Sequence, residues 1–272
     1  MISSENYLYI GIPLSVLLIL LIIYLTLYYK KFIKNEKFSE TITNGPSNNS
    51  EQFPAYVICL SEKLYQTALK NINLPNLQKF DAIKGSTLDP NKIDMTISAK
   101  RSIFVDVIRE NHRDFGSMNA IGCALSHMTL WQKVIDENLE GMYIFESDAV
   151  CNTQDFQQYV DLFLKEEDPH MIFFGLLGRP VGITEKISKI PGRFYGLHGY
   201  MITKNGAKRC LQYAKPLEQQ IDSYLSDLNI LSNDVNNKLN LEPLNLYVVN
   251  EFKCFQRNLE GTTIQTKSVK GG

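Results

Sequence analysis

The strongest hydrophobic pattern in the chain lies near its N-terminus. Residues 7–29 (YLYIGIPLSVLLILLIIYLTLYY) contain no charged side chain. A stretch of about 20 apolar residues is long enough to cross a bilayer as a helix. The basic start and small-residue cleavage site of a secretory signal peptide are missing, which favours a retained segment over a cleaved leader. We therefore expect one transmembrane helix at residues 7–29.

The chain becomes polar immediately after this segment. Residues 30–52 are rich in Asn, Ser and Lys and include Gly and Pro, a composition typical of a linker. The lysines closest to the apolar segment are Lys30, Lys31, Lys34 and Lys37. By the positive-inside rule they predict a single-pass membrane protein whose remaining residues, 53–272, lie in the cytoplasm, with a lumenal domain as the alternative.

From residue 53 onward, short apolar runs alternate with segments of helical periodicity. The clearest helix is expected over 117–136, where apolar residues recur every three to four positions on one face. The expected strands are 55–60 (AYVICL), 80–83 (FDAI), 142–146, 171–178 (MIFFGLLG), 199–203 (GYMIT) and 246–249 (LYVV). Strands that alternate with helices predict an α/β domain with a largely parallel sheet.

Composition narrows the functional classes. The formal net charge is −1, so no global basic bias indicates a nucleic-acid partner. The five cysteines are scattered without a CxxC spacing, which favours free buried thiols over a zinc site or a dense disulfide framework. Neither GxxxxGK[ST] nor GxGxxG occurs, which argues against a P-loop ATPase and a dinucleotide oxidoreductase.

Two carboxylates follow one of the predicted strands, in the stretch YIFESDAV (143–150). Ligands of open α/β sheets bind beyond the carboxyl ends of the strands, where Glu146 and Asp148 are expected. Side chains two positions apart along a strand lean to the same side, so the two like charges would repel unless a cation lies between them. A divalent ion held by oxygens and a phosphate would satisfy the pair. The alternative is two solvated loop acids.

Three further segments contain candidate chemistry. Ser126 and His127 are adjacent on the predicted helix and do not face each other, so they are not a nucleophile and base; they either serve the structure or contact a ligand. Gly199 either lets the backbone approach a ligand or relieves crowding. Asp222, on a helical segment, is either a solvated acid or a functional residue, which would act as a catalytic base or form a hydrogen bond to sugar hydroxyls.

The order of these segments resembles glycosyltransferase family 25, the group of lipopolysaccharide-type and collagen galactosyltransferases. The segments that carry the resemblance are AYVICL, FDAIKGSTL, AIGCALSHMTLW, YIFESDA, GLHGYMITKNGAKRCL, QQIDSYL and FQRNLEGTTI, which together span roughly residues 54–266. The family usually has Glu-Asp-Asp where this chain has Glu146-Ser147-Asp148.

The resemblance implies an A-type, Rossmann-like glycosyltransferase domain at 53–272. It also implies an inverting, metal-dependent reaction, in which a hexose such as galactose moves from a UDP-sugar to a hydroxyl of a glycan, glycolipid or protein. Asp148 would bind Mn²⁺ or another divalent cation, and Glu146 would support the metal or contact the donor ribose. Asp222 would be the catalytic base. The residues expected to contact the donor are Ser126, His127, Gly199 and Tyr200.

The residue between the two acids leaves a second function open. Ser147 stands where the family usually has an acid, so a catalytically inactive, membrane-tethered binding or scaffold protein is the alternative. Metal-dependent binding of a nucleotide would distinguish an enzyme from such a scaffold.

Overall fold

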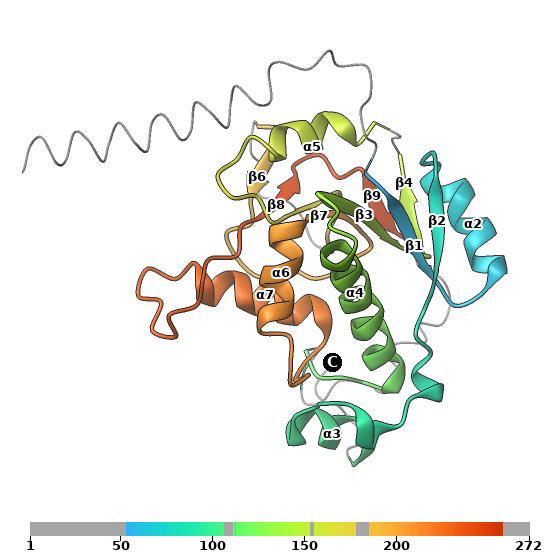
Figure 1. Cartoon of the computed structure of the whole chain (residues 1–272), viewed down its shortest axis with the longest axis vertical. Helices are drawn as coiled ribbons and strands as arrows, with labels where there is room; N and C mark the ends of the chain where they lie inside the picture. The colour runs from blue at the N-terminus through green and yellow to red at the C-terminus, as the bar shows by residue number, and fades with distance from the viewer. Residues whose placement is uncertain (1–52, 106–110, 112, 153–154, 178–184, 258–272) are drawn as a thin grey trace, which may run out of the picture. The chain divides into compact units, whose positions relative to one another are not determined.

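The computed structural model describes residues 53–105, 111, 113–152, 155–177 and 185–257, the coloured parts of Figure 1. The transmembrane helix predicted at 7–29 and the linker predicted at 30–52 lie outside these ranges. Within the ranges, none of the helices combines the length and the apolar character that a bilayer span needs.

A seven-stranded sheet in the order β2-β1-β3-β7-β5-β8-β6 forms the centre of the fold. Its strands are β1 (Ala55–Cys59), β2 (Leu77–Asp81), β3 (Gly141–Glu146), β5 (Met171–Phe173), β6 (Ile187–Lys189), β7 (Gly199–Thr203) and β8 (Leu246–Val249). Strand β7 is antiparallel to both of its neighbours and β6 is antiparallel to β8, whereas the other pairs are parallel. Five of the seven strands thus run in the same direction, and the prediction of an α/β domain with a mostly parallel sheet is confirmed for the described residues.

Helices cover both faces of this sheet (Figure 1). They are α2 (Glu62–Ile72), α3 (Ile97–Phe104), α4 (Met118–Asp136), α5 (Gln157–Phe163), α6 (Lys204–Gln212) and α7 (Ile221–Ser232), with short 3₁₀ turns η1 (Gly85–Thr87) and η2 (Pro90–Lys92). One core cluster contains residues of α4, α6 and α7, and the other contains residues of α2 and α5. The helix predicted over 117–136 corresponds to α4.

Strand β3 shows why both faces are needed. Met142 and Ile144 belong to the cluster with α4, whereas Tyr143 and Phe145 belong to the cluster with α2 and α5. Successive strand side chains point to opposite faces, so a run that is apolar at every position requires a cover on each side. Packing on both faces therefore fixes the position of β3 and of Glu146, the acid at its last residue.

A separate two-stranded sheet corrects one expectation from the sequence. Strand β4 (Ala149–Cys151) pairs antiparallel with β9 (Cys254–Gln256), and Cys151 lies opposite Cys254. Their Cα atoms are 4.2 Å apart and the two sulfurs form a disulfide, so the prediction of free thiols is wrong for this pair. The pairing could not be read from the sequence because 103 positions separate the two residues. The thiols of Cys59, Cys123 and Cys210 are free.

Candidate active site

The site begins where β3 ends. The strand is buried from Gly141 to Phe145, and the side chain of Glu146 retains 19% of its exposure. The backbone N–H of Glu146 donates to the carbonyl of His198, the residue before β7, at 3.1 Å. A turn over 147–148 then leads into β4. Glu146 and Asp148 therefore stand at the carboxyl edge of the sheet, the position where open α/β folds bind ligands.

Behind Glu146, three side chains form a chain of hydrogen bonds through the interior. Indole Nε1 of Trp131 lies 2.9 Å from the hydroxyl of Tyr200. That hydroxyl lies 2.8 Å from Nδ1 of His127, whose Nε2 lies 3.2 Å from Oε1 of Glu146. Trp131, Tyr200 and His127 are fully buried. The chain therefore connects the sheet interior to one oxygen of the carboxylate.

The direction of this chain follows from its first member. An indole N–H can only donate, so the Tyr200 oxygen accepts from Trp131 and its own proton is directed to Nδ1 of His127. We therefore assign the ring proton of His127 to Nε2, which donates it to Glu146. Burial has the largest single effect and raises the pKa of Glu146. The hydrogen bond and the electrostatic interaction with His127, with smaller contributions from His198 and Cys123, together outweigh burial and hold the pKa below its ordinary value. Glu146 is thus kept ionised with one oxygen occupied.

Ser126 has a structural position. Its side chain is fully buried; the hydroxyl donates to the carbonyl of Gly122 at 2.7 Å and accepts from the N–H of Ile83 at 2.9 Å. The loop before η1 packs so closely on α4 that a Cβ on Gly122 would lie 2.2 Å from the Ile83 carbonyl oxygen. Ser126 therefore joins the loop to α4, and its expected contact with a donor stays a prediction.

The other three expected donor contacts also point inward. His127 and Tyr200 are fully buried in the hydrogen-bond chain, and Gly199 is buried at the start of β7. A Cβ on Gly199 would lie 3.1 Å from the ring of Phe145 and 3.2 Å from the sulfur of Cys254. Of the two explanations offered for a glycine at position 199, relief of crowding is the one that these short distances support. Within the described residues, these side chains support the site from behind.

Asp148 is held by backbone and side-chain groups that follow β8. Its Oδ2 accepts from Nε2 of Gln256 at 2.9 Å, and its carbonyl accepts from the N–H of Arg257 at 2.8 Å. Oδ1 is buried without a hydrogen-bond partner among the described residues. Burial, with a smaller contribution from the charge of Glu146, raises the pKa of Asp148 to about 6. A cation would provide a partner for Oδ1 and would reduce the repulsion between the charges of Asp148 and Glu146.

Asp222 approaches the same region from the first turn of α7. Its Oδ2 accepts from the N–H of Gly196 at 3.1 Å, and its Oδ1 accepts from the N–H of Ser223 at 2.7 Å. Burial raises the pKa of Asp222 above its ordinary value, although both backbone donors oppose that change. The two bonds fix the carboxylate while leaving it partly exposed, a combination that suits a proton acceptor.

Cys123 lies among the three acids, and the sequence interpretation missed it. Burial raises the pKa of its thiol well above the ordinary value, and the charges of Glu146, Asp222 and Asp148 add to this effect in that order. The structure thus brings together the three carboxylates that the sequence singled out. The signal available was helical spacing, because Cys123 and His127 are four positions apart on one face of α4.

Two sets of ligands could hold a metal here. Cys123, His127 and Glu146 each offer an atom within 4.8 Å of the others. Nε2 of His127, however, carries the proton that it donates to Glu146, and it would have to lose that proton to bind an ion. The free oxygens of Asp148 and Glu146 are better ligands for Mn²⁺ or Mg²⁺, which prefer oxygen.

His198 is the second residue that the sequence interpretation missed. Its ring is buried; Nε2 lies 3.2 Å from the carbonyl of Cys254, and Nδ1 has no hydrogen-bond partner among the described residues. Burial lowers the pKa of His198, although Glu146 opposes this change. It lies inside the segment GLHGYMITKNGAKRCL, but nothing in the sequence pattern singled it out, so its contacts are revealed only by the fold.

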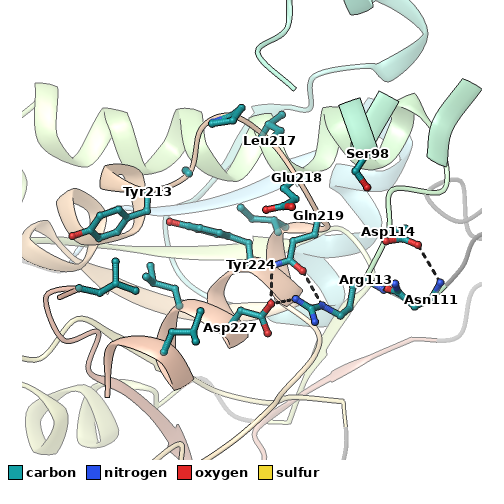
Figure 2. A pocket seen from close by; sticks show the side chains of 16 residues that line it. Ser98, Asn111, Arg113, Asp114, Tyr213, Leu217, Glu218, Gln219, Tyr224 and Asp227 are labelled. Carbon is teal, nitrogen blue, oxygen red and sulfur yellow. Dashed lines mark hydrogen bonds and ion pairs between the residues drawn. The ribbon is translucent and has the colours of Figure 1, made fainter. Parts of the chain in front are cut away.

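A cavity of about 420 Å³ lies beside α7 (Figure 2). Inside it, Nε of Arg113 donates to Gln219 at 2.9 Å, Nε2 of Gln219 donates to Asp227 at 3.0 Å, and Arg113 forms an ion pair with Asp227. Among the described residues, none of the three site carboxylates lines this cavity. Its network instead anchors α7, and therefore Asp222, to the segment that precedes α4.

Part of the chain is similar to a known protein family. Residues 53–182 match the family model described as glycosyltransferase family 25 (LPS biosynthesis protein). A Haemophilus influenzae protein whose name provisionally calls it a glycosyltransferase is 28% identical over 160 residues, which cover 56% of this chain and 53% of that protein. The lipooligosaccharide biosynthesis protein lex-1 of the same organism is 29% identical over 167 residues, covering 54% of this chain and 51% of its own length. The chain thus spans about half the length of these curated relatives.

Among solved structures, the crystal structure of A197 from STIV aligns with 78% of this chain and 97% of its own. The TM-score is 0.35 and the sequence identity is 11%. A similarity at this level carries no argument about fold or function.

Proposed function

Residues 53–182 match the model of glycosyltransferase family 25, and from this match we propose that the chain transfers a sugar from a nucleotide donor to an acceptor hydroxyl. In detail, we propose an A-type, metal-dependent, inverting hexosyltransferase that uses a UDP-sugar, with galactose as the hexose. The acceptor is a hydroxyl of a glycan, a glycolipid or a protein. The names of the two relatives, a glycosyltransferase and a lipooligosaccharide biosynthesis protein, support this class of reaction.

The observation that carries the proposal is the unsatisfied carboxylate oxygen of Asp148. Oδ1 is buried without a hydrogen-bond partner among the described residues, and the neighbouring Glu146 carries a second negative charge. A buried acceptor of this kind is costly unless a ligand satisfies it. A divalent cation fits, and Asp148 would hold it with Glu146 in support. When bound, the cation would neutralise charge on the departing nucleoside diphosphate.

Glu146 and Asp222 would divide the remaining work. His127 occupies one oxygen of Glu146, so the other oxygen is available for the donor ribose or for the cation's shell. Asp222 would accept the proton of the acceptor hydroxyl as that hydroxyl attacks the anomeric carbon from the face opposite the leaving group. Its two backbone donors keep the carboxylate oriented, and its raised pKa makes it a better proton acceptor once it is ionised.

Residues 7–29 would anchor the enzyme in a membrane as a single-pass protein. The lysines that follow the segment support a cytoplasmic catalytic domain. The Cys151–Cys254 disulfide supports the lumenal alternative, because disulfides persist mainly in oxidising compartments.

The test is sugar transfer by the full chain in detergent with a panel of UDP-hexoses and Mn²⁺. We expect release of UDP that stops when a chelator removes the metal and returns when Mn²⁺ is added back. Asp148→Asn should lower this activity by about 10²-fold or more, because it removes a ligand charge at the metal.

The matched control is Asp155→Asn, since Asp155 accepts from Gln158 on the exposed surface of the domain. This variant should retain full activity. UDP release that ignores both chelation and Asp148→Asn would contradict the metal site, and an absence of metal-dependent UDP binding would favour the scaffold alternative.

A further inference from the structure

We infer that Gln256 is a positioning residue for Asp148, and that the Cys151–Cys254 disulfide holds Gln256 in place, so that the metal site depends on the redox state of this bond. The inference rests on the proposed function, because it concerns the same carboxylate. It assigns a role to Gln256 and a redox regulation to the site, and neither the family match nor the motifs indicate these.

Strand β9 contacts the site at three points. Its last residue, Gln256, donates through Nε2 to Oδ2 of Asp148 at 2.9 Å. The next N–H, that of Arg257, donates to the Asp148 carbonyl at 2.8 Å. Its first residue, Cys254, presents its carbonyl to Nε2 of His198 at 3.2 Å. The position of β9 therefore determines how Asp148 and His198 are held.

The amide of Gln256 fixes which oxygen of Asp148 remains free. A neutral donor on Oδ2 keeps the carboxylate from rotating away from Glu146, although the two like charges repel. Oδ1 is then left without a partner, ready for a cation. Without the amide, Asp148 would turn toward solvent to separate the charges, and the cation would lose a preorganised ligand.

Strand β9 needs a covalent link because it is short. It spans three residues, Cys254–Gln256, and pairs only with the three-residue β4 within the described part of its sheet. Two further bonds run from the N–H groups of Lys253 and Cys254 to the Phe174 carbonyl, at 2.7 and 3.0 Å. A two-stranded ribbon is marginally stable by itself. The disulfide joins β9 to β4 three residues after Asp148 and two residues before Gln256.

The two sulfurs differ in access, which defines the reduction step. Cys254 is fully buried, whereas Cys151 is partly exposed. The thiolate of a small dithiol would attack Cys151, forming a mixed disulfide and releasing Cys254 as a thiolate that takes up a proton. The second thiol of the reagent would then displace Cys151. Two electrons pass from the dithiol to the protein, leaving two protein thiols and an oxidised reagent, and β9 is held by hydrogen bonds alone.

If the metal site depends on the disulfide, its activity depends on whether the domain lies in the cytoplasm or in the lumen. If the domain lies in the cytoplasm, as the lysines after residue 29 predict, the reduced form would prevail there. On the lumenal side the bond would persist and the metal site would stay organised. The enzyme would therefore be more active in an oxidising compartment.

The first arm of the test measures Mn²⁺ binding to the full chain by calorimetry in the presence of UDP. Gln256→Ala should weaken Mn²⁺ binding by about tenfold, the loss typical of removing a residue that orients a metal ligand. Gln256→Glu should weaken it further, because the same shape then carries a charge that repels Asp148. Gln256 is exposed, so neither change should affect folding. Gln158→Ala, which removes an amide from the surface acid Asp155, is the matched control and should change nothing.

The second arm changes the redox state. Alkylation of the denatured chain without reductant should modify three cysteines, and prior reduction should raise this number to five. Dithiothreitol should weaken Mn²⁺ binding to the wild type by about tenfold, through the same loss of ligand orientation. The Cys151→Ser/Cys254→Ser double variant should bind Mn²⁺ like the reduced wild type and should not respond to dithiothreitol.

The outcomes separate this inference from the proposed function. Mn²⁺ binding that is unchanged by Gln256→Ala, Gln256→Glu and dithiothreitol would overturn the inference alone, as would alkylation of five cysteines before reduction. An absence of Mn²⁺ binding in every form of the protein would overturn the metal-dependent function, and the inference with it.

Discussion

The interior behind Glu146 and the surface in front of it are built on opposite principles. Behind it, the polar side chains of Trp131, Tyr200 and His127 bond to one another and end on the carboxylate. In front of it, Oδ1 of Asp148 and Nδ1 of His198 are buried without hydrogen-bond partners among the described residues. The hydrogen bonds of the first region are satisfied within the folded protein, whereas the second region has unpaired polar atoms that a ligand would satisfy.

This difference separates the effects of substitutions in the two regions. A fully bonded buried network contributes to stability, and removing one member leaves a costly unpaired group. An incompletely bonded acid contributes little to stability, so changing it should affect ligand binding or chemistry. Substitutions behind Glu146 should therefore lower the free energy of unfolding, and substitutions in front of it should lower activity.

The largest expected effect is that of Asp222→Asn. It removes the proposed base while keeping the size of the side chain, so sugar transfer with UDP-hexose and Mn²⁺ should fall by about 10²–10⁴-fold in kcat. Thermal unfolding should show a loss of at most about 1–3 kcal/mol, because Asn keeps one acceptor oxygen and one of the N–H groups of Gly196 and Ser223 loses its partner. Removing a charge that burial disfavours offsets part of this loss.

Asp227→Asn is the informative counterpart, since Asp227 lies on the same helix and pairs with Arg113 and Arg193 instead of facing the site. It should lower stability more than kcat. Equal losses of kcat in the two variants would remove the distinction between the regions on α7.

Tyr200→Phe tests the interior directly. Without the hydroxyl, the indole N–H of Trp131 and Nδ1 of His127 both lose their partner in a fully buried space. An unpaired buried group costs about 1–3 kcal/mol, so chemical denaturation should show a loss in that range or above it. The ring of His127 would lose the hydrogen bond that orients it, which should weaken its bond to Glu146 and lower kcat in addition.

The control for this variant is Tyr65→Phe. The hydroxyl of Tyr65 makes one partly buried bond, to the Leu77 carbonyl at 2.8 Å. Its removal should cost about 0.5–1.5 kcal/mol and leave kcat unchanged. If Tyr200→Phe cost no more than Tyr65→Phe, the chain of bonds behind Glu146 would not be the stabilising unit described above.

Ser126→Ala should have a smaller effect in the same region. The N–H of Ile83 would lose its acceptor at the crowded contact between the loop and α4, which should cost about 1–2 kcal/mol in unfolding experiments. Thr129→Ala, which removes an exposed bond to a carbonyl of the same helix, should stay within about 0.5 kcal/mol. A strong loss of donor affinity in Ser126→Ala at unchanged stability would restore the role in donor contact that the sequence suggested.

The sequence predicted features of the site that depend on local order along the chain. The apolar run 141–145 and the acids after it were enough to place Glu146 and Asp148 at a strand end, and helical periodicity was enough for α4. It could not predict which face of α4 would be covered. His127 is buried because β7 runs antiparallel beside β3 and brings Tyr200 against it, and this pairing joins segments far apart in the sequence.

The link between β4 and β9 was unpredictable for the same reason. Cys151 and Cys254 are 103 positions apart in the sequence and are neighbours only through the pairing of β4 with β9. Gln256 lies in the FQRNLEGTTI segment that contributed to the resemblance, but its contact with Asp148 depends on that long-range pairing. Local patterns thus identified the acids, and tertiary contacts determined their supports.

The smallest expected effect is a pH dependence of stability from a buried histidine at the opposite edge of the sheet. His170 precedes β5; its Nδ1 accepts from the N–H of Asn245 at 2.9 Å, and its Nε2 lies 3.1 Å from Oδ2 of Asp168 without the alignment of a hydrogen bond. Burial lowers the pKa of His170 below its ordinary value, although Asp168 opposes that change. The unfolded chain therefore binds a proton here at a higher pH than the folded chain does.

The sign of the effect follows from this order. As the pH falls from the ordinary histidine pKa of about 6.5 toward the lower value in the folded protein, the unfolded state gains the proton first and stability decreases. His170→Asn keeps an acceptor for Asn245 but cannot titrate, so its free energy of unfolding should fall less steeply over this range in urea titrations. His198, whose pKa is also lowered, should leave a residual slope. An unchanged slope in His170→Asn would mean that folding leaves the pKa of His170 at its ordinary value. A steeper fall in the variant would mean that the contact with Asp168 keeps His170 protonated in the folded protein, so that this edge of the sheet is paired as the interior behind Glu146 is.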